Sequence, residues 1–271
     1  MPQYAEIAEQ AARAAGRVLL EMLGRAKVFE KGPKDMVTEA DRMAQSVVQN
    51  IVLNAFPDHD FLGEEDTPSD GPISPRKAQG SQPSLRWIVD PLDGTANYVH
   101  SMPGFAVSIA LERNGEVLTG VVLDPLLNEC YIAVRGEGAF LNGKRLKVSK
   151  CQRLADAMVA ASFPANVERS SPEITAFAEV LVASQSVRRL GSAALNLCYL
   201  AAGRADAYWA TSVKSWDVAA GVLLVQEAGG TMTAVDGSPF VLAEPKFIAA
   251  ATPGLHSELV EILQRVWGTG S

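Results

Sequence analysis

The stretch Arg86–His100, RWIVDPLDGTANYVH, constrains the fold of this chain more than any other. It begins with a β-branched and aromatic run that is typical of a strand. Pro91 fixes its own φ angle and donates no backbone hydrogen bond, so we expect the strand to end there. The stretch also brings Asp90 and Asp93 close together, and two such carboxylates repel each other and are costly to bury. A divalent cation would neutralise both, although a plain turn with solvated carboxylates is the alternative interpretation.

Hairpin signals dominate the middle of the chain. Asn114-Gly115 and Asn142-Gly143 are residue pairs that tight hairpin turns prefer, and strand-like runs flank both. We therefore expect an antiparallel meander over residues 105–148. Residues 157–251 alternate strand-like and helical runs, which predicts a mixed α/β half. The sequence thus predicts an α/β fold of layered helices and sheets, with one half at residues 1–150 and the other at residues 151–271.

Two segments before the central stretch carry acids with simple structural interpretations. Thr38–Asp41 has the spacing of a capping box before a helical run, so Asp41 is interpreted as a helix-start carboxylate. Glu64 lies in an acidic run that, taken alone, indicates a solvated loop. The Pro-, Gly- and Ser-rich run Thr67–Ser84 predicts an exposed, mobile loop. The polar loop Lys31–Asp35 is a candidate to close over a site near Asp41.

Composition and charge exclude several classes of protein. A net charge of −7 leaves no basic surplus to meet phosphate backbones, so no nucleic-acid partner is expected. No signal peptide or membrane span is visible. Cys130, Cys151 and Cys198 are scattered and odd in number, which predicts buried free thiols and suits a reducing cytoplasm. The three histidines are isolated, which argues against a histidine-rich zinc site.

Four sequence blocks stand in the order found in the inositol monophosphatase family, namely Val37–Asp41, Gly63–Glu65, Trp87–Tyr98 and Trp216–Gly221. Gly191–Ala194 resembles the family segment between the last two blocks. The resemblance covers nearly the whole chain, and the third and fourth blocks are specific. It implies an alternating αβαβα sandwich of the inositol monophosphatase and fructose-1,6-bisphosphatase type.

The resemblance further implies a site for two Mg²⁺ ions. Glu64, Asp90 and the backbone carbonyl of Leu92 would hold one ion. Asp90, Asp93 and Asp217 would hold the second, with Asp90 bridging. Glu64 would also share a weaker third ion through water. These roles replace the simpler interpretations of Glu64 as a loop acid and of Asp217 as a helix cap.

The implied chemistry is hydrolysis of a small phosphate monoester by a metal-activated water, without a phosphoenzyme. Glu64 and the Thr95 hydroxyl would orient and deprotonate this water, and Asp41 would hydrogen-bond Thr95. The backbone amides of Gly94 and Thr95 would receive phosphate oxygens. The family also implies a homodimer and inhibition by Li⁺ and by excess Mg²⁺. The expected substrate-binding residues are Asp93, Gly94, Thr95, Ser192, Ala193 and Asp217.

One position bears on the choice of substrate. Many family members that cleave inositol phosphates carry a glutamate seven residues before the Trp-Asp aspartate, and here that position is Ala210. Lys214 adds a positive charge nearby, although a solvated loop lysine is its simplest interpretation. The resemblance implies an inositol monophosphate-like substrate, whereas Ala210 favours another phosphate. The alternatives are histidinol phosphate, fructose 1,6-bisphosphate, another sugar phosphate, or 3′-phosphoadenosine 5′-phosphate.

Two other functions compete with this hypothesis. A haloacid-dehalogenase-type phosphatase would use an aspartyl nucleophile in a DxDGT motif, but Asp90 and Asp93 are three residues apart, not two. A non-catalytic metal-binding protein is the more distant alternative. The presence of Glu64, Thr95 and Asp217 argues against a loss of activity.

Overall fold

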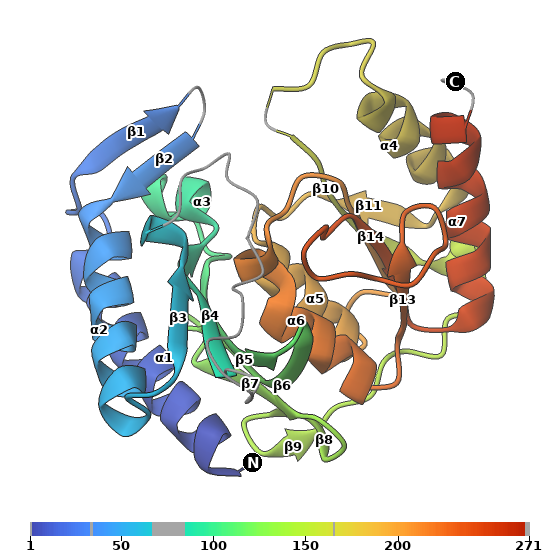
Figure 1. Ribbon diagram of the computed structural model, residues 1–271. Coiled ribbons are helices and arrows are strands. Elements are labelled where there is room, and N and C mark those ends of the chain that lie inside the picture. The colour runs from blue at the N-terminus through green and yellow to red at the C-terminus, as the bar shows by residue number, and fades with distance from the viewer. Residues whose placement is uncertain (1, 33–34, 67–84, 165, 269–271) are drawn as a thin grey trace.

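The computed structural model describes residues 2–32, 35–66, 85–164 and 166–268 (Figure 1). The predicted loop Thr67–Ser84, and the centre of the predicted loop Lys31–Asp35, lie outside the described residues. The elements in chain order are α1 (Pro2–Met22), β1 (Val28–Gly32), β2 (Asp35–Thr38), α2 (Glu39–Ala55), β3 (Asp60–Gly63), η1 (Glu64–Asp66), β4 (Leu85–Asp93), α3 (Thr95–Val99), β5 (Ala106–Arg113), β6 (Glu116–Asp124), β7 (Glu129–Val134), β8 (Gly138–Leu141), β9 (Lys144–Arg145), η2 (Leu154–Asp156), β10 (Met158–Ser162), α4 (Pro172–Ala183), β11 (Ser186–Arg188), α5 (Ala193–Ala201), β12 (Ala207–Ala210), α6 (Ser215–Glu227), β13 (Thr231–Ala234), β14 (Phe247–Ala250) and α7 (Pro253–Gly268).

The larger sheet has the strand order β3-β4-β5-β6-β7-β8-β9. Strands β4 to β9 form an antiparallel meander, as the hairpin signals predict. Asn114 and Gly115 have φ angles of 55° and 83°, and Asn142 and Gly143 have φ angles of 46° and 78°. Asparagine and glycine tolerate this left-handed region, so they can form the tight turns. Strand β3 was not predicted, and it pairs with β4 in parallel.

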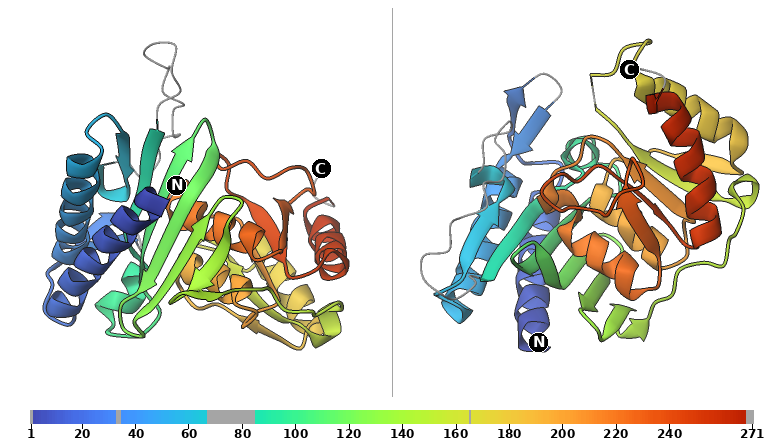
Figure 2. Two further views of the ribbon diagram at one scale, coloured as in Figure 1. Left: turned by 90° about the horizontal axis from the view of Figure 1, so that it is seen from below. Right: turned by 45° about the vertical axis from the view of Figure 1, so that its right-hand side comes forward.

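The smaller sheet has the strand order β11-β10-β12-β14-β13 and mixes parallel with antiparallel pairs. Five layers result, and they confirm the expected alternating sandwich (Figures 1 and 2). Helices α1 and α2 pack on one face of the larger sheet, and α5 and α6 pack on its other face. The smaller sheet covers α5 and α6 from the far side, and α4 and α7 form the outer layer.

Helix α6 comes unusually close to the larger sheet. A Cβ atom added to Gly120 of β6 would lie 2.8 Å from the Ala220 backbone. Only a glycine therefore fits at position 120 without a shift of the helix. This close packing fixes the distance between α6 and the larger sheet, and with it the position of Asp217 in the first turn of α6.

The prediction that β4 ends at Pro91 was wrong. Pairing with β5 runs from Leu85↔Arg113 to Asp90↔Ser108 and resumes at Asp93↔Ala106, with a bulge between. A bulge accommodates a proline because the inserted residues make no ladder hydrogen bonds. The bulge therefore sets Asp90 and Asp93 on the two sides of an interruption within one strand.

All three cysteines are free; Cys130 and Cys198 are buried as predicted, whereas Cys151 is half-buried. Within the described ranges, no helix combines the length and the apolar character that crossing a bilayer requires.

Candidate functional site

The parallel pair β3–β4 brings Glu64 beside Asp90. Gly63 lies opposite Val89 in the register, so the residues that follow them, Glu64 and Asp90, leave the pair at the same end. Asp90 is 2 % exposed, and its Oδ1 accepts a hydrogen bond from the Leu92 backbone at 2.9 Å. Burial, followed by the charges of Glu64, Asp93 and Asp217, raises the pKa of Asp90 well above its ordinary value. Four acids therefore act on one another here.

Asp93 binds the start of α5, about one hundred residues later in the chain. The Ser192 hydroxyl donates to Oδ2 of Asp93, and the backbone amide of Ala194 donates to the same oxygen at 2.8 Å. The amide of Ala193 donates to Oδ1 at 3.2 Å. Burial raises the pKa of Asp93 to about 6, although these three donors oppose the shift. The structure thus brings Ser192 and Ala193 together with Asp93, as partners of its carboxylate.

Asp217 lies in the first turn of α6, with its carboxylate partly buried. Its Oδ2 accepts the backbone N–H of Lys214 at 2.8 Å, which is the interaction of a helix cap. Burial and the charges of Asp93 and Glu64 raise the pKa of Asp217 well above its ordinary value, while a hydrogen bond with Asp90 opposes the shift. The Asp217 carboxylate therefore both caps α6 and lies near the other carboxylates.

Asp41 connects α2 to the central turn. Its Oδ2 accepts the Thr38 amide at 2.9 Å and the Thr38 hydroxyl at 2.6 Å, which completes the predicted capping box. The Thr95 hydroxyl lies 3.4 Å from Oδ1 of Asp41 and 3.0 Å from the Leu92 carbonyl. One hydroxyl proton can serve only one acceptor at a time. Burial raises the pKa of Asp41 to about 6, so Thr95 stands between a carboxyl that titrates near neutrality and a backbone carbonyl.

Gly94 forms the corner between β4 and α3. Its φ angle is 90°, in the left-handed region, and a Cβ atom there would lie 2.8 Å from the Gly104 carbonyl oxygen. Any larger residue would be strained at this position and would push the two loops apart. Gly94 therefore allows the chain to turn from Asp93 directly into the helix that starts at Thr95.

Sequence reasoning missed Gln45, whose side chain hydrogen-bonds the backbone next to Glu64. It is 5 % exposed on α2, one helical turn after Asp41, and its Oε1 accepts the Glu65 amide at 2.9 Å. A Cβ atom on Gly63 would overlap the Gln45 amide. The i, i+4 spacing from Asp41 and the glycine before Glu64 were the available signals.

Asn97 was also missed, although it lies in the block Trp87–Tyr98. Its Nδ2 donates to the Gly104 carbonyl at 2.7 Å and to the Leu190 carbonyl at 2.8 Å. The second bond joins α3 to the loop before Ser192. Asn97 thus helps fix where α5 begins relative to Asp93.

The donor set suits a hard divalent cation. Glu64, Asp90, Asp93 and Asp217 supply carboxylate oxygens, and oxygen ligands of this kind are the ones that Mg²⁺ prefers. Burial is the largest cause of the raised pKa values of Asp90 and Asp217, and the charges of the neighbouring acids add to both shifts. A cation would relieve this repulsion. As the described side chains stand, no three acidic, imidazole or thiol groups form a ready-made metal cluster.

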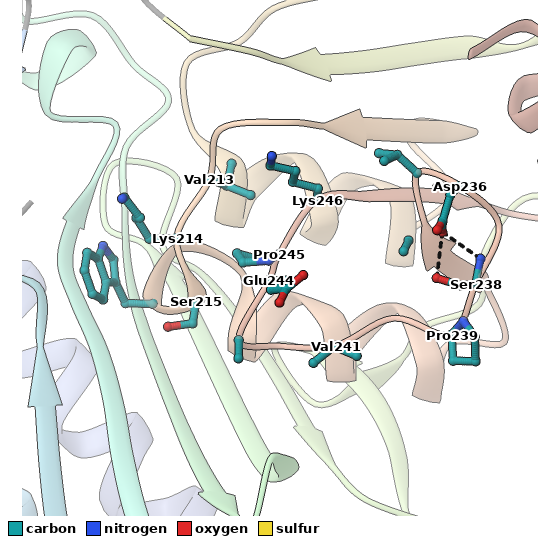
Figure 3. Close-up of a pocket in the computed structure, with 14 residues that line it drawn as sticks. Val213, Lys214, Ser215, Asp236, Ser238, Pro239, Val241, Glu244, Pro245 and Lys246 are labelled. Atoms are coloured by element: carbon teal, nitrogen blue, oxygen red, sulfur yellow. Dashed lines mark hydrogen bonds between the residues drawn. The ribbon is translucent and has the colours of Figure 1, made fainter. Parts of the chain in front are cut away.

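Ala210 and Lys214 lie between the end of β12 and the start of α6, shortly before Asp217 in the chain. Ala210 ends β12, is fully buried, and pairs with Ser162 and Phe247. Lys214 is exposed and lines a cavity of about 660 Å³ in front of α6 (Figure 3). The sequence did not predict this cavity, because its far wall comes from residues 234–246.

Comparisons with known proteins agree with this architecture. The model of the inositol monophosphatase family matches residues 1–267. An inositol-1-monophosphatase of Rhizobium meliloti is 39% identical over 261 residues, covering 94% of each chain. A fructose-1,6-bisphosphatase/inositol-1-monophosphatase of Aquifex aeolicus is 36% identical, covering 98% of this chain and 97% of its own. The crystal structure of the extragenic suppressor protein suhB from Bartonella henselae superposes with a TM-score of 0.86 at 37% identity, covering 96% of this chain and 98% of that chain.

Proposed function

The chain belongs to the inositol monophosphatase family, and from this we propose that it is a Mg²⁺-dependent phosphatase that hydrolyses a small phosphate monoester by direct attack of water. The observation that carries the proposal is the convergence of Glu64, Asp90, Asp93 and Asp217, whose charges oppose one another. Burying several like charges together is costly in free energy unless a cation neutralises them. The proposed site combines acids from residues 1–150 with Asp217 from residues 151–271. We propose this division as the domain boundary.

In the proposed site, Glu64, Asp90 and the Leu92 carbonyl would hold one Mg²⁺, and Asp90, Asp93 and Asp217 would hold the second. A third, weaker ion is shared by Glu64 through water. When bound, Mg²⁺ neutralises the phosphate and makes a coordinated water more acidic. Each carboxylate oxygen has two lone pairs, so Asp90 would be able to serve as a ligand while its Oδ1 keeps the hydrogen bond from the Leu92 amide.

The protein's own groups then handle the proton. The Glu64 carboxylate accepts a proton from the attacking water, and the Thr95 hydroxyl orients that water. Asp41 orients the Thr95 side chain by accepting a hydrogen bond from its hydroxyl, with 3.4 Å between Thr95 Oγ1 and Asp41 Oδ1. The backbone amides of Gly94 and Thr95 receive phosphate oxygens, and Ser192 and Ala193 keep Asp93 oriented toward the substrate.

The substrate that we propose is inositol monophosphate-like. The names of relatives support this class, since the Rhizobium meliloti protein is named for inositol 1-phosphate and the Aquifex aeolicus protein for two substrates. Ala210 argues for a broader range, because a buried alanine offers no hydrogen bond to inositol hydroxyls. Histidinol phosphate, sugar phosphates and 3′-phosphoadenosine 5′-phosphate are the alternatives that a phosphate-release panel separates.

The decisive experiment combines chelation with one substitution. Removal of divalent ions by EDTA should abolish phosphate release, and added Mg²⁺ should restore it. Glu64→Gln should lower kcat by about 10³-fold, because it removes the general base and a metal ligand. Asp66→Asn, in the same short helix η1 but exposed, is the matched control and should keep full activity. Full activity of Glu64→Gln in EDTA would rule out the mechanism.

Three further properties belong to the proposal. Li⁺ and excess Mg²⁺ should inhibit, the protein should be a homodimer, and it should act in the cytoplasm without a nucleic-acid or membrane partner. Titration of activity with LiCl and measurement of mass by light scattering test the first two.

A further inference from the structure

Two polar side chains of α2 face the segments that carry the proposed proton-handling groups. Asp41 and Gln45 are one helical turn apart, so they share a face of the helix, and they are only 1 % and 5 % exposed. The other buried residues of α2, an element that the structure describes in full, are alanines and valines. Buried polar groups are stable only with hydrogen-bond partners, so the partners of these two side chains indicate what the helix supports.

The partners belong to the two segments that would handle the proton. Thr95 Oγ1 lies 3.4 Å from Oδ1 of Asp41, and Thr95 is the residue proposed to orient the attacking water. Gln45 Oε1 accepts the backbone amide of Glu65 at 2.9 Å, and Glu65 directly follows Glu64 in η1. One helix face therefore supports both groups, Thr95 through its hydroxyl and Glu64 through the backbone next to it.

Gly63 gives Gln45 a second contact, on the other side of Glu64. Gly63 ends β3 and lies opposite Val89 in the parallel register. A Cβ atom there would lie 2.8 Å from Nε2 of Gln45 and would overlap the rest of its amide group. Gly63 does not adopt a positive φ angle, so the glycine provides space for the amide rather than an unusual backbone conformation. Gln45 thus contacts the residue before Glu64 and the residue after it.

We propose that Gln45 is a positioning residue for Glu64, and that α2 thereby sets the separation between the proposed general base and the Thr95 hydroxyl. The inference rests on the proposed function, since that function gives Glu64 its roles as base and metal ligand. In this role Gln45 touches neither substrate nor metal ion, and it acts by fixing the backbone on both sides of Glu64. A misplacement of a reacting group by about 1 Å can cost about 100-fold in rate.

The first test removes the acceptor and keeps the volume. Gln45→Met should lower kcat about 10-fold and weaken Mg²⁺ binding, measured by calorimetry, about 10-fold. Gln45→Glu keeps an acceptor oxygen and should hold both values within about threefold of the wild type. Val48→Ala is the matched control, because Val48 is buried on the same face of α2. It should lower Tm but leave kcat and Mg²⁺ affinity within about twofold.

Two double variants test the route through Glu64. In the Glu64→Gln protein, Gln45→Met should lower kcat by less than about twofold, because the group that it positions is already gone. Gly63→Ala disturbs the same contact from the other side, since the added methyl group displaces the Gln45 amide. It should weaken Mg²⁺ binding about 10-fold in the wild type, but less than about twofold in Gln45→Ala, where the methyl group has room.

The outcomes separate this inference from the proposed function. If the wild type is a Mg²⁺-dependent phosphatase and Gln45→Met changes kcat and Mg²⁺ affinity no more than Val48→Ala does, the inference is overturned and the function stands. If Gln45→Met does not fold, unchanged Mg²⁺ affinity in Gly63→Ala overturns it equally. Weakened Mg²⁺ binding by Gln45→Met, in a protein whose wild type hydrolyses no phosphate monoester, supports the positioning role and counts against the phosphatase.

Discussion

The starts of α2 and α6 are built alike and differ in their surroundings. In each helix an aspartate in the first turn accepts the backbone N–H of the residue before the helix: Asp41 accepts Thr38 at 2.9 Å, and Asp217 accepts Lys214 at 2.8 Å. Both aspartates also complement the helix dipole. As local structures, the two are nearly the same.

Their neighbours separate them. Burial raises the pKa of Asp41 to about 6, and the hydrogen bonds from Thr38 oppose this shift. Asp217 faces Asp93 and Glu64, and its pKa rises well above its ordinary value. The same cap thus supports a hydroxyl in one place and, in the proposed mechanism, a metal ion in the other. A capping aspartate thus gains a chemical role from the groups that pack against it.

The largest expected effect comes from Asp217→Asn. The side-chain oxygen of asparagine can still cap α6, but a metal ligand is lost, so kcat/KM should fall about 10³-fold. Mg²⁺ affinity, measured by calorimetry, should weaken as well. Asp156→Asn, an exposed acid in η2, is the control. A fall in kcat/KM of less than 10-fold would mean that Asp217, like Asp41, only orients other groups and binds no metal ion.

Asp41→Asn should have a smaller effect. The asparagine oxygen can keep both Thr38 bonds, whereas its amide group would face Thr95 Oγ1 as a donor. Thr95 would then lose an acceptor and its orientation, so kcat should fall about 10- to 100-fold. Mg²⁺ affinity should stay within about twofold of the wild type, because Asp41 is not a proposed ligand. A loss of Mg²⁺ affinity like that of Asp217→Asn would remove the distinction between the two helices.

The pH dependence of stability tests the shared property of these acids. Asp41 and Asp93 have pKa values of about 6 in the folded protein, above their ordinary values, so the folded state holds more protons than the unfolded state between about pH 4 and pH 6. Without metal, their contribution to stability is therefore present at low pH and is lost as pH rises through 6.

Thermal unfolding in EDTA should accordingly show Tm falling between about pH 4 and pH 6, and saturating Mg²⁺ should raise Tm most at the upper end. Asp41→Asn should reduce the slope, because it removes one titrating group. A metal-free Tm that rises steadily over this range would contradict the raised pKa values.

The smallest expected effect concerns the caps themselves. Thr38 Oγ1 accepts the Ala40 amide at 3.1 Å, so Thr38→Ala should cost about 1 kcal/mol of unfolding free energy. The Lys214 ammonium has no acceptor atom, so Lys214→Ala should stay within about 0.5 kcal/mol of the wild type. Urea denaturation measures both. Equal losses would mean that the two helix starts are not stabilised in different ways.

Much of the fold could be predicted from short segments. The two Asn-Gly pairs located the hairpins, and the capping box located the start of α2, because these signals depend on a few neighbouring residues. The same holds for the turn at Asp90–Gly94, whose crowded acids indicated a cation. The end of β4 was missed at Pro91, since a bulge depends on the partner strand as well as on the proline.

Short sequence patterns indicated which residues carry chemistry, namely the acids, Gly94 and the four blocks that resemble a family. Which of these residues meet depends on packing between distant segments. The parallel pairing of β3 with β4 sets Glu64 beside Asp90, the start of α5 binds Asp93, and the Gln45 side chain packs against Gly63. The physical reason is distance along the chain. Contacts between residues about 100 positions apart form only when whole apolar faces pack together, and no local pattern records that packing.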